Sequence, residues 1–312
     1  MSTYGSKATV SGMRPIRPER GVTLIELVLA IVLVGIIVAA VSFFLNPIRQ
    51  STDLALRAEL TDIADNALQR IGRDVKLALP NSVRTATAGS SVYVEFIAVR
   101  TAGRYRADGG GAAAGTNCAN DDASLPAPGN DQLSFDLADT CFKTIGKLPD
   151  AIVAGSDQLV LNNYGLAGQD AYQTAGTLNR TLITAFDSTE ANRDRIVFAS
   201  TTFQRALHDS PGKRFYAITG PVTYECDMAS GRILRHSGYA LSAAQPTAFV
   251  GGALIAENVQ ATINGCEFKY STVAIGPQLG LLTMRITLQR ALFGGTTETI
   301  SLYHAVHVNN TP

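Results

Sequence analysis

The stretch Arg20-Gly21-Val22-Thr23-Leu24-Ile25-Glu26 decides how the N-terminal part of this chain is built. A short basic leader meets an apolar run here, and the run carries one carboxylate, Glu26, close to its start. A carboxylate inside a membrane helix costs roughly 2.5 to 3.5 kcal/mol on insertion scales. Glu26 therefore needs either a partner that neutralises its charge or a function.

The apolar run continues from this stretch over residues 27–45, LVLAIVLVGIIVAAVSFFL, in which Ser42 is the one polar side chain. About 20 such residues let a helix cross about 30 Å of hydrocarbon. The leader, residues 1–21, carries four basic side chains against Glu19, and a basic flank stays on the cytoplasmic side of a membrane. We expect one span over residues 22–45 with a cytoplasmic N-terminus. The alternative is an ordinary secretory signal cut near Ala39-Ala40-Val41.

Residues 46–80 carry a second helical pattern. Asn46-Pro47 should kink or briefly interrupt the helix, because proline has no N–H to donate and clashes with the preceding turn. Apolar residues then recur at steps of three and four, with charged residues on the other faces: Leu56, Leu60, Ile63, Ala67, Ile71, Val75 and Leu79. We expect an amphipathic helix that ends at Pro80 and packs its apolar stripe on a sheet.

The remaining residues, 81–312, read as a β-rich globular domain. Short apolar runs bounded by polar clusters predict strands at 92–99, 133–137, 157–164, 195–199, 215–219, 222–226, 232–239, 254–263, 267–270, 281–289 and 299–308. A hairpin is expected around Asp227 to Gly231. The predicted fold is α+β, with a long N-terminal helix, half membrane-spanning and half amphipathic, packed on a mainly antiparallel sheet.

The chain has four cysteines, and no two of them have the Cys-x-x-Cys spacing of a zinc or redox site. Disulfides are the better interpretation, and they imply an oxidising compartment. Four cysteines allow three connectivities. Sequence order favours Cys118 with Cys141 and Cys226 with Cys266.

The sequence predicts neither an enzyme nor a nucleic-acid binder. Lys plus Arg and Asp plus Glu balance at 26 each, so the chain lacks the basic excess of nucleic-acid partners. A P-loop is absent, which excludes the ATPase of an assembly machine. His208-Asp209-Ser210 holds triad residue types, but chain neighbours rarely point at one another and a Gly-x-Ser-x-Gly elbow is absent. We interpret it as a turn.

No metal or other cofactor is predicted either. His304 and His307 lie three apart in an expected strand, so they face opposite sides and are expected at the surface. The acids Asp121, Asp122, Asp150 and Asp157 lack the spacing of a calcium loop. The low-complexity stretch 109–115, GGGAAAG, is expected to be a surface loop, with a binding loop as the alternative.

The stretch from Gly21 to Glu26 resembles the class III signal of type IV prepilins. The resemblance implies that prepilin peptidase cuts between Gly21 and Val22 and that the new amino group of Val22 is methylated. Val22 stands where the family usually has phenylalanine. Glu26 and Thr23 would set the register of assembly, with the Glu26 carboxylate meeting the Val22 ammonium of a neighbouring subunit, so that two costs of burial cancel. The alternative is a helix-start carboxylate at the headgroup boundary, favoured by the helix dipole.

The same resemblance implies partners and a location. The partners are other minor and major pilins, the prepilin peptidase, an inner-membrane assembly platform, and membrane lipid through residues 27–45. No nucleic acid is expected. The protein would sit in the inner membrane with its C-terminal domain in the periplasm, and later in the pilus at the cell surface.

Two parts of the body carry a narrower resemblance. They are 220–226, GPVTYEC, with 231–235, GRILR, and the ending 301–312, SLYHAVHVNNTP. Both look like the large minor prepilins of the mannose-sensitive haemagglutinin (MSHA) pilus, whose relatives include PilW-like minor pilins and J-type pseudopilins. The resemblance implies a structural subunit that primes or caps a pilus used for surface attachment. The alternatives are a J-type minor pseudopilin of a type II secretion system and a signal-anchored periplasmic enzyme or sugar-binding module.

Overall fold

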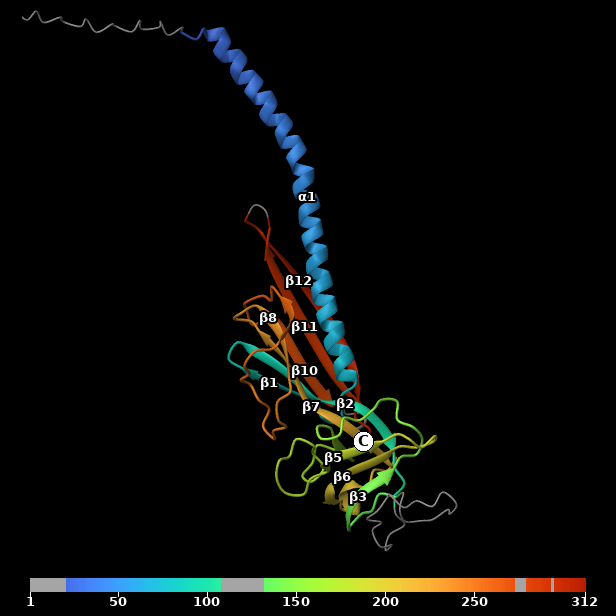
Figure 1. Ribbon diagram of the computed structural model, residues 1–312. Helices are drawn as coiled ribbons and strands as arrows, with labels where there is room; N and C mark the ends of the chain where they lie inside the picture. Colours follow the sequence, from blue (N-terminus) through green and yellow to red (C-terminus); the bar gives the residue numbers. More distant parts are fainter. Residues whose placement is uncertain (1–20, 108–131, 273–278, 293–294) are drawn as a thin grey trace, which may run out of the picture. The chain divides into compact units, whose positions relative to one another are not determined.

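The structure is a computed structural model that describes residues 21–107, 132–272, 279–292 and 295–312. The chain divides into two units, Met1–Leu54 and Ala55–Pro312. Helix α1 (Leu24–Lys76) begins in the first unit and ends in the second. An apolar N-terminal helix followed by a mostly antiparallel β body makes the fold α+β (Figure 1).

Helix α1 differs from the prediction at two places. It continues through Asn46-Pro47 without interruption, although a kink or a brief interruption was expected there. Proline removes a single backbone donor, and the hydrogen bonds of the flanking turns maintain the helix. The helix also ends at Lys76, before the predicted end at Leu79. The backbone N–H of Leu79 instead donates to the Ile97 carbonyl oxygen at 2.8 Å, so tertiary pairing replaces the last turn.

The second unit contains two antiparallel sheets. The nine-stranded sheet has the order β1-β2-β7-β4-β5-β6-β3, and β8 pairs with both β7 and β9. Its strands are β1 (Arg84–Ala88), β2 (Ser91–Arg104), β3 (Ala138–Lys143), β4 (Gln158–Leu161), β5 (Arg180–Asp187), β6 (Arg195–Thr202), β7 (Arg214–Asp227), β8 (Arg232–Ser237) and β9 (Ala253–Glu257). The three-stranded sheet consists of β10 (Cys266–Thr272), β11 (Leu279–Ala291) and β12 (Thr297–Asn309). A short helix, α2 (Arg205–His208), lies between β6 and β7.

The predicted strand at 133–137 was wrong. Strand β3 begins only at Ala138, because Asp136 adopts φ 63°, a left-handed conformation that ends extended structure. The expected strand 254–263 is likewise cut short at Glu257 by Asn258 with φ 66°.

Strand β7 runs through a point where a break was expected. Runs 215–219 and 222–226 form one strand, in which Gly220 and Pro221 pair in register with Ala98 and Ile97 of β2. A register shift beside Ala98, where Thr219 of β7 has no register partner on β2, absorbs the irregularity. The predicted hairpin from β7 to β8 is confirmed. Strands β1 and β5 were missed, since RTATA has only alanines as apolar residues and the apolar residues of RTLITAFD do not alternate with polar ones.

The apolar stripe of α1 is buried in the main core of the second unit. Its buried side chains pack with residues of both sheets, and they are Leu60, Ala64, Ala67, Leu68, Ile71 and Val75. Burial of each large aliphatic side chain among them contributes about 1.5 to 3 kcal/mol. The helix approaches β12 closely at Gly72, where an added Cβ would lie 3.1 Å from His304 Nε2. His304 is therefore half-buried beneath α1, not on the surface as predicted, while His307 faces outward.

One disulfide ties the two sheets together. Cys226 of β7 is bonded to Cys266 of β10, with their Cα atoms 6.4 Å apart, as sequence order predicted. Cys141 is buried in β3, but Cys118 lies outside the described residues. The pairing of Cys118 with Cys141 stays a prediction, as does the loop at 109–115, which also lies outside them.

A peptide map of the oxidised protein tests both bridges. We expect non-reducing digestion to release one fragment that joins the peptides of Cys226 and Cys266, and another that joins those of Cys118 and Cys141. Reduction should separate each into its two peptides. A fragment joining Cys118 to Cys226 would contradict both pairings.

Candidate functional site

The start of helix α1 is organised by Thr23. The Thr23 Oγ1 atom accepts a hydrogen bond from the backbone N–H of Glu26 at 3.3 Å, and the Thr23 carbonyl oxygen accepts one from Leu27 N–H at 3.1 Å. A threonine in this position satisfies one of the backbone donors that a helix leaves free at its N-terminus. Thr23 thereby fixes Gly21 and Val22 as the residues directly before the helix and Glu26 as a residue of its first turn.

Gly21 and Val22 are accessible. Both are exposed, and no atom lies within 4 Å of the position that a Cβ on Gly21 would take. A peptide bond that lies outside the helix and carries a small residue is open to an enzyme that must bind both sides of it. The geometry thus leaves the predicted cleavage site unobstructed.

The apolar side chains after Glu26 are not buried by other described residues of the first unit. Every residue from Val22 to Ser42 is exposed, and Leu24–Ser42 is long and apolar enough to span a membrane. The one hydroxyl in this stretch is satisfied internally, since Ser42 Oγ donates to the Val38 carbonyl oxygen at 2.8 Å. So large an exposed apolar surface needs lipid or neighbouring helices around it. The helix with its preceding motif is consistent with a single-pass membrane anchor.

Glu26 is the one acidic residue in this stretch, and it lies in the first turn of α1. The helix dipole favours a negative charge at this end. Within the described part of the chain, no ion pair to its carboxylate is present. The carboxylate therefore points a charge outward from an otherwise apolar surface, where a cation supplied from outside the chain can meet it.

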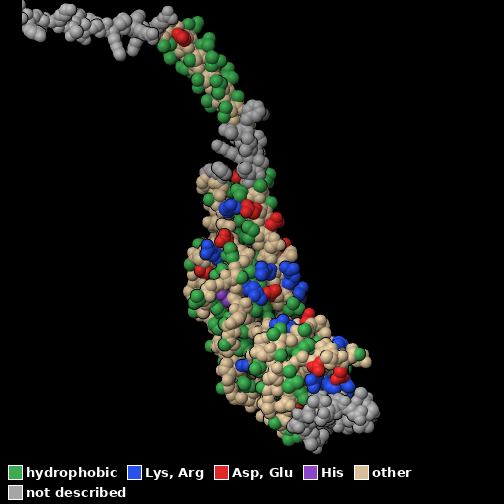
Figure 2. All heavy atoms as spheres, viewed as in Figure 1, with side chains coloured by type: hydrophobic (Ala, Val, Ile, Leu, Met, Phe, Trp, Pro, Cys, Tyr) green, Lys and Arg blue, Asp and Glu red, His purple; other side chains and the backbone are tan. Residues whose placement is uncertain are grey.

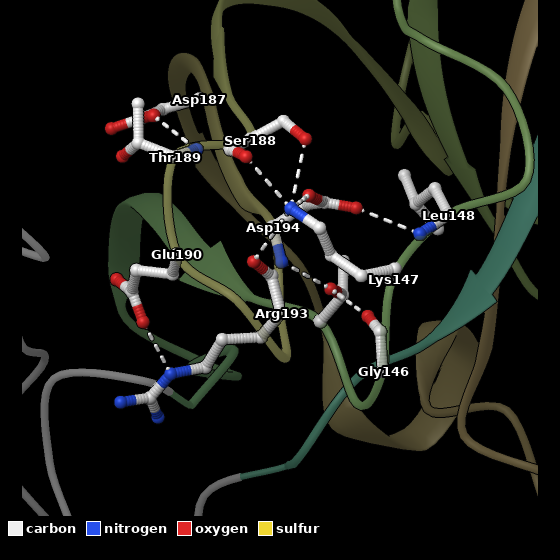
Figure 3. A network of polar contacts seen from close by, with 10 residues as sticks. Gly146, Lys147, Leu148, Asp187, Ser188, Thr189, Glu190, Arg193 and Asp194 are labelled. Atoms are coloured by element: carbon white, nitrogen blue, oxygen red, sulfur yellow. Dashed lines mark hydrogen bonds and ion pairs between the residues drawn. The ribbon is translucent and has the colours of Figure 1, made fainter.

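The polar network of Figure 3 joins charged residues of the β5–β6 loop to the segment before β4, and its contacts are structural. The buried Asp194 carboxylate accepts hydrogen bonds from Lys147 Nζ at 2.6 Å and from Leu148 N–H at 2.7 Å. Burial raises the pKa of Asp194, but these hydrogen bonds outweigh it and hold the pKa below its usual range. Lys147 also donates to Ser188, which ties the β5–β6 loop to the segment before β4. These donors and acceptors bond to one another, so the network holds the β5–β6 loop against the segment before β4.

The residues His208, Asp209 and Ser210 do not form a catalytic group. His208 is buried at the end of α2, so the expected turn is replaced by a short helix. Its Nε2 lies 2.8 Å from the Gly168 carbonyl oxygen, and its Nδ1 accepts from Gln204 N–H. Asp209 binds Lys213 and Tyr105 instead of the histidine.

Of the four acids considered for calcium, the structure describes Asp150 and Asp157. Asp157 is buried and bonded to Arg100 at 2.6 Å, whereas Asp150 is exposed. Asp121 and Asp122 lie outside the described residues. Among the residues that the structure does describe, no three His, Cys, Asp or Glu side chains come together as a metal site.

An open hollow of about 400 Å³ beside β8 was not foreseen from the sequence. Its wall includes His236, whose ring stacks on Phe249 at 4.3 Å and whose Nε2 lies 2.9 Å from Glu225 Oε2. The hollow is lined by residues of β8 and of the irregular segment 238–252. The sequence of this segment has no periodicity from which its structure could be predicted. Gly252 is required there, since a Cβ would lie 2.7 Å from the His236 ring. These contacts hold the segment against the sheet.

The chain has no significant match among curated proteins or solved structures. The N-terminal stretch does have a match. Residues 16–42 fit the family described as the prokaryotic N-terminal methylation motif, and this range includes Gly21, Val22, Thr23 and Glu26. The chain thus carries, over its capped helix start and the apolar run behind it, the N-terminal motif of type IV pilin-like proteins.

Proposed function

We propose that this protein is a minor pilin of a type IV pilus of the MSHA type, similar to the minor prepilin MshO, and that it helps to prime or cap the filament. One observation carries the proposal. An accessible Gly21-Val22 bond stands directly before a Thr23-capped helix, whose exposed apolar surface carries Glu26 in the first turn. The matched methylation motif covers the same residues.

The proposed mechanism begins with the membrane. The basic leader keeps the N-terminus cytoplasmic, and the apolar half of α1 holds the subunit in the inner membrane with the body in the periplasm. Prepilin peptidase hydrolyses the peptide bond after Gly21, which leaves a free ammonium on Val22, and this new amino group is then methylated in a separate step. The Glu26 carboxylate then pairs with the Val22 ammonium of a neighbouring pilin, so that neither charge is left unpaired in an apolar surrounding. The assembly platform extracts the subunit while this pair sets its register.

The body supplies bulk and contact surface in this proposal, not catalysis. The triad residue types have separate partners, and the charged network of Figure 3 is satisfied internally. A J-type pseudopilin at the tip of a secretion pseudopilus shares this mechanism, and the genes adjoining this one distinguish the two. A pilus ATPase among small prepilin genes favours the pilus.

Mass spectrometry of the mature N-terminus tests the proposal. We expect the protein from producing cells to begin at Val22 with one methyl group on its amino nitrogen. Replacing Gly21 by alanine changes the residue on the leader side of the cut and should leave the full leader attached. Replacing Gly35, which also has open space around it, by alanine is the matched control and should leave processing normal.

An intact N-terminus in the unchanged chain would contradict the proposal. It would favour the second alternative, a signal-anchored binding module or enzyme whose pilin-like start serves only for export.

A further inference from the structure

Strand β12 forms a long open edge of the three-stranded sheet. Within the described part of the chain it pairs with β11 alone (Figure 1). It is 13 residues long, whereas the other edge strands, β1, β3, β9 and β10, have five to seven residues. Proteins usually protect an exposed edge by keeping it short or by placing lysine or proline on it. β12 contains neither residue, and its one carboxylate, Glu298, is paired with Arg57 of α1 at 2.7 Å. The edge is therefore open to another strand.

The register of the sheet shows which backbone groups of β12 point to the open edge. The N–H of Thr287 in β11 donates to the Gly265 carbonyl oxygen at 2.8 Å, on the side of β11 away from β12. Thr287 lies opposite Ser301. In an antiparallel pair, opposite residues exchange either both backbone hydrogen bonds or none, and the two kinds of pair alternate. Thr299, Ser301 and Tyr303 therefore direct their backbone N–H and C=O groups to the open edge.

These outward groups of Thr299, Ser301 and Tyr303 have no partner in the part of the chain that the structure describes. β12 bonds to β11, and no described group elsewhere bonds to these backbone atoms. Because a strand rises about 3.3 to 3.4 Å per residue, the row repeats a donor and an acceptor about every 6.7 Å. An extended peptide backbone repeats its own donors and acceptors at the same spacing. The row therefore selects an added β-strand, and not a lipid, a sugar or an ion.

Apolar cover is also missing along this edge. Ile286 and Leu288 of β11 are fully buried, whereas Leu302 and Ile300, which lie opposite them on β12, are only partly buried. The alternate residues of β12 face the other way and are exposed. Figure 2 shows mostly uncharged surface, tan and green, at the upper end of the body beside β11 and β12. An added strand therefore needs apolar side chains on its inner face, next to Ile300 and Leu302, and polar uncharged ones on its outer face.

We propose that the open edge of β12 binds an extended, uncharged segment of another protein, with alternating apolar and polar side chains, as a fourth strand of this sheet. A second copy of the chain fits less well. β12 runs in the same direction as α1, because Glu298 contacts Arg57 and His304 lies at Gly72. Antiparallel pairing of two β12 edges would turn the two helices in opposite directions, while one membrane holds both copies by the same end. The inference goes beyond the proposed function, since the sheet edge carries it in any protein with this body.

A defined peptide tests the strand addition. The probe is a fluorescent peptide of seven alternating threonine and isoleucine residues, with two lysines at each end for solubility, added to the full-length protein in detergent micelles. We expect saturable binding by fluorescence anisotropy. Ser301→Pro removes one outward N–H and leaves the bonds to β11 in place, so it should weaken binding about tenfold or more. Ser301→Ala is the matched control, because both variants lose the hydroxyl contact with Thr287 but alanine keeps the N–H. It should bind the peptide as the unchanged chain does.

A second peptide avoids any change to the protein. The threonines of the added strand lie on the outer face opposite Ser301, so their N–H groups bond to β12. Methylating these nitrogens keeps the side chains and removes the donors, and binding to the unchanged chain should fall about tenfold or more. Equal binding of the two peptides, or no binding of the first, would overturn the inference.

Hydrogen exchange at single residues tests whether the edge is open. In the protein alone, the N–H groups of Thr299, Ser301 and Tyr303 should exchange about tenfold or more faster than those of Ile300 and Leu302, which are bonded to β11. The peptide should slow the first set and leave the second unchanged. Slow exchange of the first set in the protein alone would mean that the chain itself or a second copy covers the edge, and would overturn the inference. An unprocessed Val22 would overturn the proposed function alone.

Discussion

Replacing Glu26 by alanine should abolish piliation while the protein remains stable in the membrane. The Glu26 carboxylate lies in the first turn of α1 on a surface whose other side chains are apolar. If a neighbour's Val22 ammonium pairs with it, the substitution leaves that ammonium unpaired among apolar groups. Removing one member of a buried charge pair costs about 3 to 5 kcal/mol, which corresponds to roughly 200- to 5,000-fold in association. Insertion should improve, because a charge leaves the apolar run.

The measurement is the number of pili per cell by electron microscopy, together with an immunoblot of the membrane fraction. Glu26→Gln keeps the shape and removes the charge, so it should fail like alanine if the charge pair matters. Glu19→Ala is the matched control, because that carboxylate lies in the leader that cleavage removes. Normal piliation by Glu26→Ala would show that the residue has no part in assembly.

The N-terminal part of the molecule was the most predictable, because its structure depends on local features. The uncharged run and the three-and-four spacing of Leu60, Ile63 and Ala67 act between residues that are close in the chain. At Pro47, where a kink or a brief interruption was predicted, the helix continues without interruption.

The body was less predictable, because distant residues decide its pairing. Gly220 and Pro221 look like a break in the sequence, yet β2, more than a hundred residues earlier, extends the strand through them. Similarly, the half-buried position of Asp74 on α1 depends on hydrogen bonds from Tyr224 and Arg235, which lie far from it in the sequence. The buried pair of Arg84 and Glu95 is a further example. Two charged residues eleven apart near a strand turn would ordinarily be placed at the surface.

Replacing Arg84 by alanine should lower the free energy of unfolding of the body by about 3 kcal/mol. Glu95 is fully buried, and its Oε2 lies 2.6 Å from Arg84 Nε. The guanidinium also donates to the carbonyl oxygens of Ala243 and Ser242, which hold the segment 238–252. Without it, the carboxylate keeps one donor, Tyr239 Oη at 2.9 Å, and its charge is uncompensated. Urea denaturation measures the loss, and Arg232→Ala, which breaks an exposed pair with Glu257, should cost roughly 1 kcal/mol or less.

The pH dependence of this loss separates a buried charge from a simple loss of packing. Burial raises the pKa of Glu95, and the hydrogen bond from Arg84 opposes that rise, so Arg84→Ala should raise the pKa further. The folded state then takes up a proton at a higher pH than the unfolded state, whose Glu95 titrates near its ordinary value of 4.5. Stability lost at neutral pH should therefore return as the pH falls toward that value. Adding Glu95→Gln should recover much of the stability at pH 7 and remove the pH dependence, because no charge is then buried. A deficit that stays constant between pH 7 and pH 5 would assign the effect to the lost contacts of the Arg84 side chain.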